Sequence, residues 1–125
     1  MKFVHEGRFV LLQPQGQLDA QAGMNLKQQV LAIESDQFNL CIVDLAQVDF
    51  IDSAGLLSLV SGLNAANRKN CRLVFCNLRP SVRLIFEITQ LDSVFELFDT
   101  FSEATAGILQ GSEQMSWPTA EPVAA

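Results

Sequence analysis

Apolar and polar residues follow one another along this chain in a pattern that predicts alternating strands and helices. Short apolar runs predict five strands, at residues 2–6, 9–13, 40–43, 72–76 and 94–98. Gly7-Arg8 lies between the first two runs and predicts a tight hairpin. The run at 40–43 has no polar alternation, which is typical of a strand that is covered on both faces.

Between these strands, apolar residues recur at helical spacing. The first such segment predicts a helix over about 20–34, with Asp19 placed where a carboxylate can cap the free backbone N–H groups. The second, over 54–68, is apolar over a wide arc and is therefore expected to be well buried. Pro80 suits the first turn of a third helix, and residues 100–103 match a capping box for a fourth that ends near Leu109.

The resulting order of elements is β-β-α-β-α-β-α-β-α. Strands separated by helices pair in parallel through right-handed crossovers, and the opening hairpin adds one antiparallel partner. The sequence thus predicts an α/β fold, with a mixed, mostly parallel sheet of about five strands and about four helices, in one domain over 1–109. Residues 110–125 have no apolar period and hold two prolines, which predicts a flexible C-terminal tail.

Composition and charge narrow the class of protein. The chain has 125 residues, of which 49% are hydrophobic, enough for the core of a single domain. Its net charge of −6 disfavours direct binding of nucleic acid. Neither a membrane-spanning segment nor a secretory signal is evident. Five basic residues gather in one stretch and predict a local basic patch, for which a solvated face is the simpler interpretation: Arg68, Lys69, Arg72, Arg79 and Arg83.

The cysteines and the single histidine limit the chemistry. Cys41, Cys71 and Cys76 are odd in number and lack CxxC spacing, and two of them lie in apolar runs. We therefore expect buried free thiols in a reducing compartment, the cytoplasm. His5 alone gives almost nothing from which to build a histidine metal site or a Ser–His triad, so we expect no metal and no cofactor.

The segment from Val43 to Leu56 carries the main functional signal. A buried strand ends near Asp44, an apolar pair follows at 50–51, and Asp52-Ser53 opens a helix. Such strand-to-helix junctions are where open α/β sheets bind ligands and partners. Ser53 lies at or next to the N-cap, so capping of the helix is the plain structural interpretation of its hydroxyl.

An enzymatic role finds little support in this segment. A nucleophile elbow requires Gly-x-Ser-x-Gly, and Ile51 occupies the position of the first glycine. The carboxylates of Asp44, Asp49 and Asp52 are not accompanied by a glycine-rich phosphate loop. We therefore predict that the chain is not an enzyme.

The same residues resemble a known family. Asp-Phe-Ile-Asp-Ser-Ala-Gly-Leu, at 49–56, is similar to the signature of the STAS domain (sulphate transporter and anti-sigma factor antagonist). Gly-Gln-Leu-Asp at 16–19 resembles the family's Gly-Glu-Leu-Asp, and 77–86 resembles its segment after the next strand. The resemblance extends over about 3–109 and is closest in size to the stand-alone bacterial anti-sigma factor antagonists.

This resemblance implies a phosphorylation switch. In the family, the serine after the aspartate is phosphorylated by an anti-sigma factor that is also a protein kinase, which implies Ser53 here. Ala54 replaces the serine or threonine that many members have next, so the assignment is less ambiguous. The unphosphorylated form would bind the anti-sigma factor and free the sigma factor, and a serine phosphatase would reset the phosphorylated form.

The implied partner-binding surface consists of Asp19, Asp52, Ser53, Ala54, Gly55 and Leu56. Gly55 would allow close backbone approach, and Leu56 is expected to serve the core more than the contact.

The oligomeric state stays open between a monomer and a weak dimer. Two alternatives also stay open, because the motif does not encode the partner. One is a STAS adaptor that regulates metabolism or signalling through a kinase/phosphatase pair, and the other is a transport-associated STAS subunit that binds a lipid or small molecule.

Overall fold

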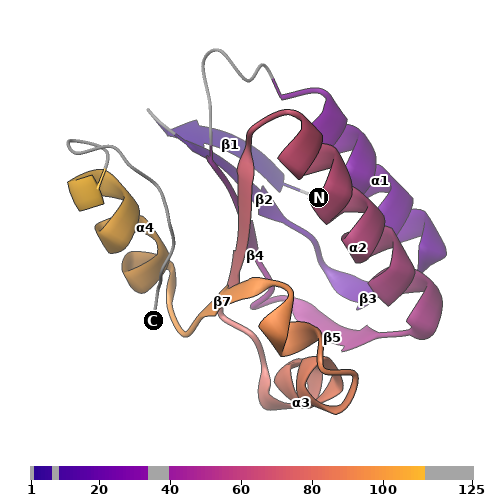
Figure 1. Ribbon diagram of the computed structural model, residues 1–125. Coiled ribbons are helices and arrows are strands. Elements are labelled where there is room, and N and C mark those ends of the chain that lie inside the picture. Colours follow the sequence, from indigo (N-terminus) through magenta and orange to yellow (C-terminus); the bar gives the residue numbers. More distant parts are fainter. Residues whose placement is uncertain (1, 7–8, 34–39, 112–125) are drawn as a thin grey trace.

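A computed structural model describes residues 2–6, 9–33 and 40–111, with side chains described for 9–33 and 40–106 (Figure 1). In chain order the elements are β1 (Lys2–Glu6), β2 (Phe9–Gln13), β3 (Gly16–Leu18), α1 (Ala20–Leu31), β4 (Leu40–Asp44), β5 (Val48–Ile51), α2 (Ser53–Arg68), β6 (Arg72–Cys76), α3 (Pro80–Ile88), the 3-10 helix η1 (Leu91–Ser93), β7 (Glu96–Phe98) and α4 (Phe101–Gly111). No helix among these residues is long and apolar enough to cross a membrane.

The main sheet has five strands in the order β1-β2-β4-β6-β7. β1 pairs with β2 in antiparallel fashion, whereas β2, β4, β6 and β7 pair in parallel. The predicted α/β fold, with a mixed and mostly parallel sheet and four helices, is confirmed. Of the opening hairpin, Gly7 and Arg8 lie outside the described residues.

A second, smaller sheet was not predicted. β3 and β5 pair in parallel, with Leu18 opposite Ile51, and form a two-stranded sheet of their own. The sequence predicted an interruption of the strand pattern at the first of these segments and a loop at the second. Strands of three and four residues are too short for alternation to stand out, and Gly16 at the start of β3 is typical of a turn. Its φ of +79° lies in the left-handed region, which favours glycine.

Residues on the strands of the main sheet alternate between two apolar layers. One layer lies under α1, α2 and α3 and includes Val43, Phe75 and Phe86. The other lies under α4 and includes Ile42, Val74 and Ala104. Figure 1 shows α1 and α2 side by side against one face of the sheet and α4 against the other. This double cover explains why β4 is buried along its apolar run, as its unbroken pattern predicted.

Several element ends differ from the predictions. α1 ends at Leu31, and residue 34, where its end was expected, lies outside the described residues. The last strand begins at Glu96, because Phe95 turns into the core after η1. The cap predicted at Thr100 is confirmed, because the Glu103 backbone N–H donates to Thr100 Oγ1. The return bond of the predicted capping box is shifted by one residue, since Glu103 Oε1 accepts from the Asp99 N–H rather than from that of Thr100. α4 extends to Gly111, and the predicted tail beyond it is outside the described residues.

Candidate functional site

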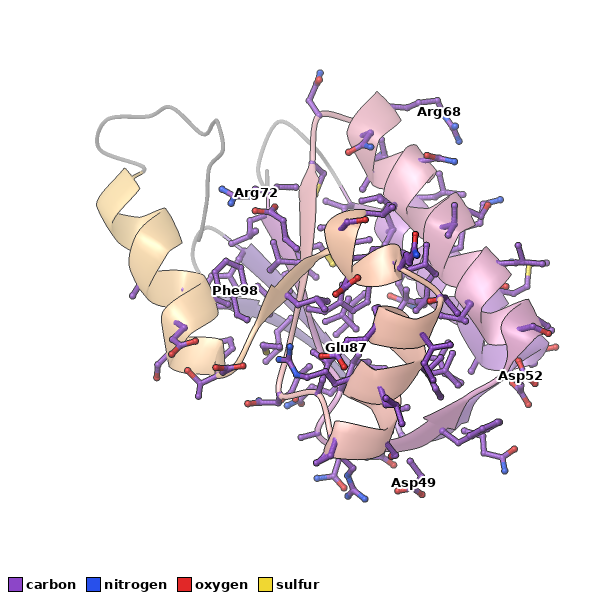
Figure 2. The ribbon with its side chains drawn as sticks, turned by 60° about the horizontal axis from the view of Figure 1, so that its bottom comes forward. Asp49, Asp52, Arg68, Arg72, Glu87 and Phe98 are labelled. Atoms are coloured by element: carbon purple, nitrogen blue, oxygen red, sulfur yellow. The ribbon has the colours of Figure 1, made fainter. Side chains whose placement is uncertain are left out.

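The two-stranded sheet brings the beginnings of α1 and α2 together. Leu18 of β3 lies opposite Ile51 of β5, and the next residues, Asp19 and Asp52, are the N-caps of the two helices. The Asp52 backbone N–H donates to the carbonyl oxygen of Leu18 at 3.4 Å. Two segments that are far apart in the sequence thus meet at one end of the molecule, near Asp52 in Figure 2.

Each of these aspartates caps its own helix. Asp19 Oδ1 accepts a hydrogen bond from the Ala22 backbone N–H at 3.0 Å, as predicted. Asp52 Oδ1 accepts one from the Gly55 N–H at 2.8 Å. A carboxylate at this position satisfies backbone donors that have no partner inside the helix and also favours the positive end of the helix dipole.

Ser53 is therefore not the cap. It is the first residue of α2, its side chain is exposed, and its hydroxyl has no hydrogen-bond partner within the described part of the chain. The capping interpretation of this hydroxyl is wrong, because Asp52 holds that role. The structure leaves Ser53 exposed to solvent at the first position of α2.

The other predicted partner-binding residues differ in exposure. Ala54 is exposed, and Leu56 is half-buried against the core, as expected. Gly55 is buried, and a Cβ atom there would lie 1.9 Å from the carbonyl oxygen of Leu18. The close approach expected at Gly55 is thus made by β3 of the same chain, and this glycine sets where α2 begins relative to the small sheet.

Two exposed apolar residues come shortly before and shortly after Ser53 in the chain. Phe50 in β5 is 48% exposed, and Leu57 in α2 is 71% exposed. The wide apolar arc predicted over 54–68 includes Leu57, and the expectation that this arc is well buried is wrong at this residue. The spacing was a usable signal, because Leu57 lies one helical turn after Ser53 and shares its face.

Asp44 anchors the turn that leads from the main sheet to β5. Its Oδ1 accepts hydrogen bonds from the Ala46 backbone N–H and from Asn77 Nδ2, at 2.9 and 3.1 Å. Its Oδ2 accepts one from Gln13 Nε2 at 3.1 Å. One carboxylate therefore joins the carboxyl ends of β2, β4 and β6, and this cluster fixes the direction in which the chain leaves for β5.

The start of α3 is joined to β5. The Arg79 guanidinium donates from Nε to the Ala46 carbonyl at 2.8 Å and from Nη1 to Asp49 Oδ1 at 2.9 Å. The Ser81 hydroxyl donates to the Asp49 carbonyl at 3.4 Å. α3 and the strand that precedes Ser53 are thus held as neighbours.

The five basic residues do not form one patch. Arg68 and Arg72 lie at the end of the molecule away from Asp49, as Figure 2 shows. Arg72 pairs with Glu96, and Arg83 pairs with Asp99 at 2.9 Å. Sequence proximity is misleading here because β6 carries the chain from one end of the sheet to the other between Arg72 and Arg79.

The three cysteines are free and buried, as predicted. Burial raises the pKa of Cys71 to about 11 and that of Cys76 to about 12. Burial, and then the neighbouring Cys71, raise the pKa of Cys41 as well. Among the described residues, no group of three or more His, Cys, Asp and Glu side chains could hold a metal ion.

Comparison with known proteins identifies the family. The family model of the STAS domain matches residues 1–104, and the chain belongs to that family. A Bordetella bronchiseptica protein that carries the name anti-sigma factor antagonist BtrV is 34% identical over 65 residues. The match covers 52% of this chain and 56% of that protein, so the chain matches little more than half the length of this curated relative.

Solved structures share the fold at lower identity. A Thermotoga maritima protein described as an anti-sigma factor antagonist matches with a TM-score of 0.73 and 23% identity, over 86% of this chain and 93% of that chain. A sulfate transporter family protein from Wolinella succinogenes matches with a TM-score of 0.77 and 17% identity, over 90% and 93%. The Bacillus cell fate determinant SpoIIAA in its phosphorylated form matches with a TM-score of 0.64 and 18% identity, over 86% and 97%.

Proposed function

We propose that this protein is an anti-sigma factor antagonist whose binding is controlled by phosphorylation of Ser53. The observation that carries the proposal is that Ser53 is exposed at the first position of α2. Its hydroxyl is not needed as the helix cap, because Asp52 accepts the capping hydrogen bond. The relative named as an anti-sigma factor antagonist and the phosphorylated SpoIIAA structure support it. The kinase would transfer the γ-phosphoryl group of ATP to Ser53 Oγ, with ADP leaving and the hydroxyl proton released.

A phosphate on Ser53 would change the surface more than the fold. It adds about −1.5 to −2 charges at neutral pH. The N-terminus of α2 favours an anion, because its free N–H groups and the helix dipole point toward it. The carboxylates of Asp52 and Asp19 repel the phosphate. The two effects oppose one another, so the phosphate is expected to stay in solvent above an unchanged helix.

Phosphorylation of Ser53 would change partner binding more than it changes the helix. A partner surface that fits a neutral serine must accommodate a dianion after phosphorylation, and an unpaired charge at a contact costs several kcal/mol. Each 1.4 kcal/mol is about tenfold in affinity, so a loss of about a hundredfold or more is expected. This is enough for a switch between bound and free states without any conformational transition.

The proposal includes two partners, which act on the protein in a cycle. The unphosphorylated protein binds an anti-sigma factor that is also a serine kinase, phosphorylation of Ser53 releases it, and a serine phosphatase restores the binding form. The contact surface comprises Asp19, Asp52, Ser53 and Ala54, with Leu56 and the buried Gly55 supporting it. The protein acts in the cytoplasm in this proposal, where its three free thiols stay reduced, and it has no catalytic activity of its own.

A second candidate is a STAS subunit that serves a transporter, favoured by the structural similarity to the sulfate transporter family protein. That similarity is one of fold alone. Phosphorylation distinguishes the two candidate functions, because only the proposed switch requires a phosphate on Ser53.

Intact-mass analysis of the protein recovered from its own host tests the proposal first. We expect a fraction with an added mass of about 80 Da, located on Ser53 by fragmentation. Binding to the host's anti-sigma factors is then measured for wild type, Ser53→Ala and Ser53→Glu. Ser53→Ala keeps both fold and partner, because Asp52 is the cap.

Ser53→Glu is expected to weaken binding by about a hundredfold. Ser102→Glu is the matched control, since it adds the same charge at an exposed serine in α4, on the other face of the sheet (Figure 1). Equal binding by Ser53→Glu and Ser102→Glu, or no phosphate on Ser53 under any condition or kinase, would overturn the proposal.

A further inference from the structure

An apolar stripe lies on the outer side of α3. Leu84 is 52% exposed and Ile88 is 70% exposed, and their spacing of four residues places them on one side of the helix. The inner side of the same helix packs against the core, where Val82 and Phe86 are buried. Single exposed apolar residues are common on protein surfaces, but Leu84 and Ile88 are neighbours on consecutive turns of one helix.

The stripe begins beside the strand that leads to Ser53. Ser81 precedes Leu84 by three residues on the same side of α3, and its hydroxyl donates to the Asp49 carbonyl of β5. The residue after Asp49 is the exposed Phe50, and β5 then runs into Asp52 and Ser53. β5, which carries the exposed Phe50, thus lies between the start of α2 and the start of α3.

The charges around the stripe are acidic. Glu87 is exposed between Leu84 and Ile88 in the sequence of α3, where Figure 2 labels it. Asp92 is exposed in η1, just after the helix. The two arginines of this region are already paired with carboxylates of the same chain, Arg79 with Asp49 and Arg83 with Asp99.

We propose that Leu84 and Ile88 form a second anchor for the anti-sigma factor, one that takes an amphipathic helix with an apolar face and basic flanks. Exposed apolar residues at helical spacing fit such a face, and Glu87 and Asp92 supply the complementary charge. This inference rests on the proposed function. It adds a part of the interface on α3 that lies outside the phosphorylated helix.

The α3 anchor has a kinetic consequence. Its contacts are the same whether the kinase is only bound or is transferring phosphate, because Ser53 is on another element. Such uniform binding changes KM and leaves kcat alone. The α3 anchor would therefore hold the kinase on its substrate and would contribute equally to binding before and after phosphorylation.

The test uses the full-length chain and the host's anti-sigma factors, each purified separately, with Kd measured by calorimetry. Leu84→Ser and Ile88→Ser are each expected to weaken binding about tenfold. Glu87→Lys is expected to weaken binding and to reduce its dependence on salt concentration. Leu31→Ser is the matched control, since Leu31 is an apolar residue of α1 with 46% exposure, and it is expected to bind like wild type. Thermal unfolding of each variant verifies that the fold is intact.

Phosphorylation of Ser53 gives the second readout. Ile88→Ser is expected to raise KM for the kinase about tenfold with kcat unchanged. If a host anti-sigma factor binds wild type and releases Ser53→Glu, yet binds Leu84→Ser and Ile88→Ser as tightly as Leu31→Ser, the α3 anchor is wrong and the proposed function stands. If no host anti-sigma factor binds the wild-type chain, the proposed function fails and the α3 anchor fails with it.

Discussion

At the residue scale, the helix cap and the exposed serine at the start of α2 are two different residues, whereas the sequence alone allowed one serine to be both. Asp52 caps the helix through its hydrogen bond to the Gly55 N–H, and Ser53 stays exposed. A modifiable serine that was also the cap would couple phosphorylation to helix stability, because loss of a cap costs about 1 kcal/mol. In the proposed function, phosphorylation of Ser53 would act on the surface and leave the helix end intact.

Gly55 carries the packing that fixes this helix end. Gly55→Ala would place a Cβ atom 1.9 Å from the Leu18 carbonyl oxygen, so the start of α2 must move away from β3. We expect a loss of about 1–3 kcal/mol in the free energy of unfolding, measured by urea denaturation. Gly62→Ala is the control: its Cβ atom meets only Leu26 Cδ2 at 3.9 Å. It should be neutral or stabilising by up to about 1 kcal/mol, since alanine suits a helix better than glycine. Equal stability of the two variants would contradict this account of Gly55.

At the scale of elements, a pair of very short strands places the candidate site. β3 and β5 bring the N-termini of α1 and α2 together, although Asp19 and Asp52 are 33 positions apart in the chain. The position of β5 itself depends on Asp44, which joins the ends of three strands, and on Arg79, which joins β5 to α3. The site is thus supported from the main sheet and from α3.

Asp44→Ala tests this support. The change leaves the Ala46 N–H and the amide groups of Gln13 and Asn77 without their shared acceptor. Because a polar group that loses its partner costs about 1–3 kcal/mol when buried, and less when water can reach it, we expect a loss of about 1–2 kcal/mol in unfolding free energy. Asp49→Ala, which removes only an exposed ion pair, should cost less than about 1 kcal/mol. A smaller loss for Asp44→Ala than for Asp49→Ala would show that Asp44 does not hold the turn.

At the scale of the whole molecule, helices cover both faces of the sheet and enclose all three thiols. Because their pKa values are raised, the thiols stay protonated in the folded protein at pH values above the ordinary thiol pKa of 9.0. The unfolded chain releases these protons near pH 9, so stability is fully present below that pH. It is expected to fall as pH rises from about 9 toward the folded-state pKa of Cys71, about 11.

Thiol labelling tests this burial. We expect a thiol reagent at pH 8 to modify all three cysteines rapidly in denaturant and none in the native protein, because thiolate is the reactive form and burial suppresses it. Mass spectrometry after labelling counts the modified residues. Rapid native labelling of Cys41, which lies in the central strand β4, would show that the two-layer cover opens readily.

The fold class follows from the sequence because its signals are local. The apolar run of β4, the helical spacing that begins at Ala22 and the capping box at Thr100 each report one element through its own residues. The buried free thiols followed in the same way, from apolar neighbours along the chain. The exposed Ser53 was picked out by its motif rather than by any physical property of its own segment.

The sequence by itself thus determined the main elements, their parallel pairing and the serine that the site is built around. The tertiary structure alone decided that β3 and β5 pair, that Gly55 packs on Leu18, and that Asp52 rather than Ser53 caps α2. It also decided which apolar residues of α2 and α3 stay in solvent. These features depend on contacts between segments distant in the chain, and periodicity within one segment carries no information about them.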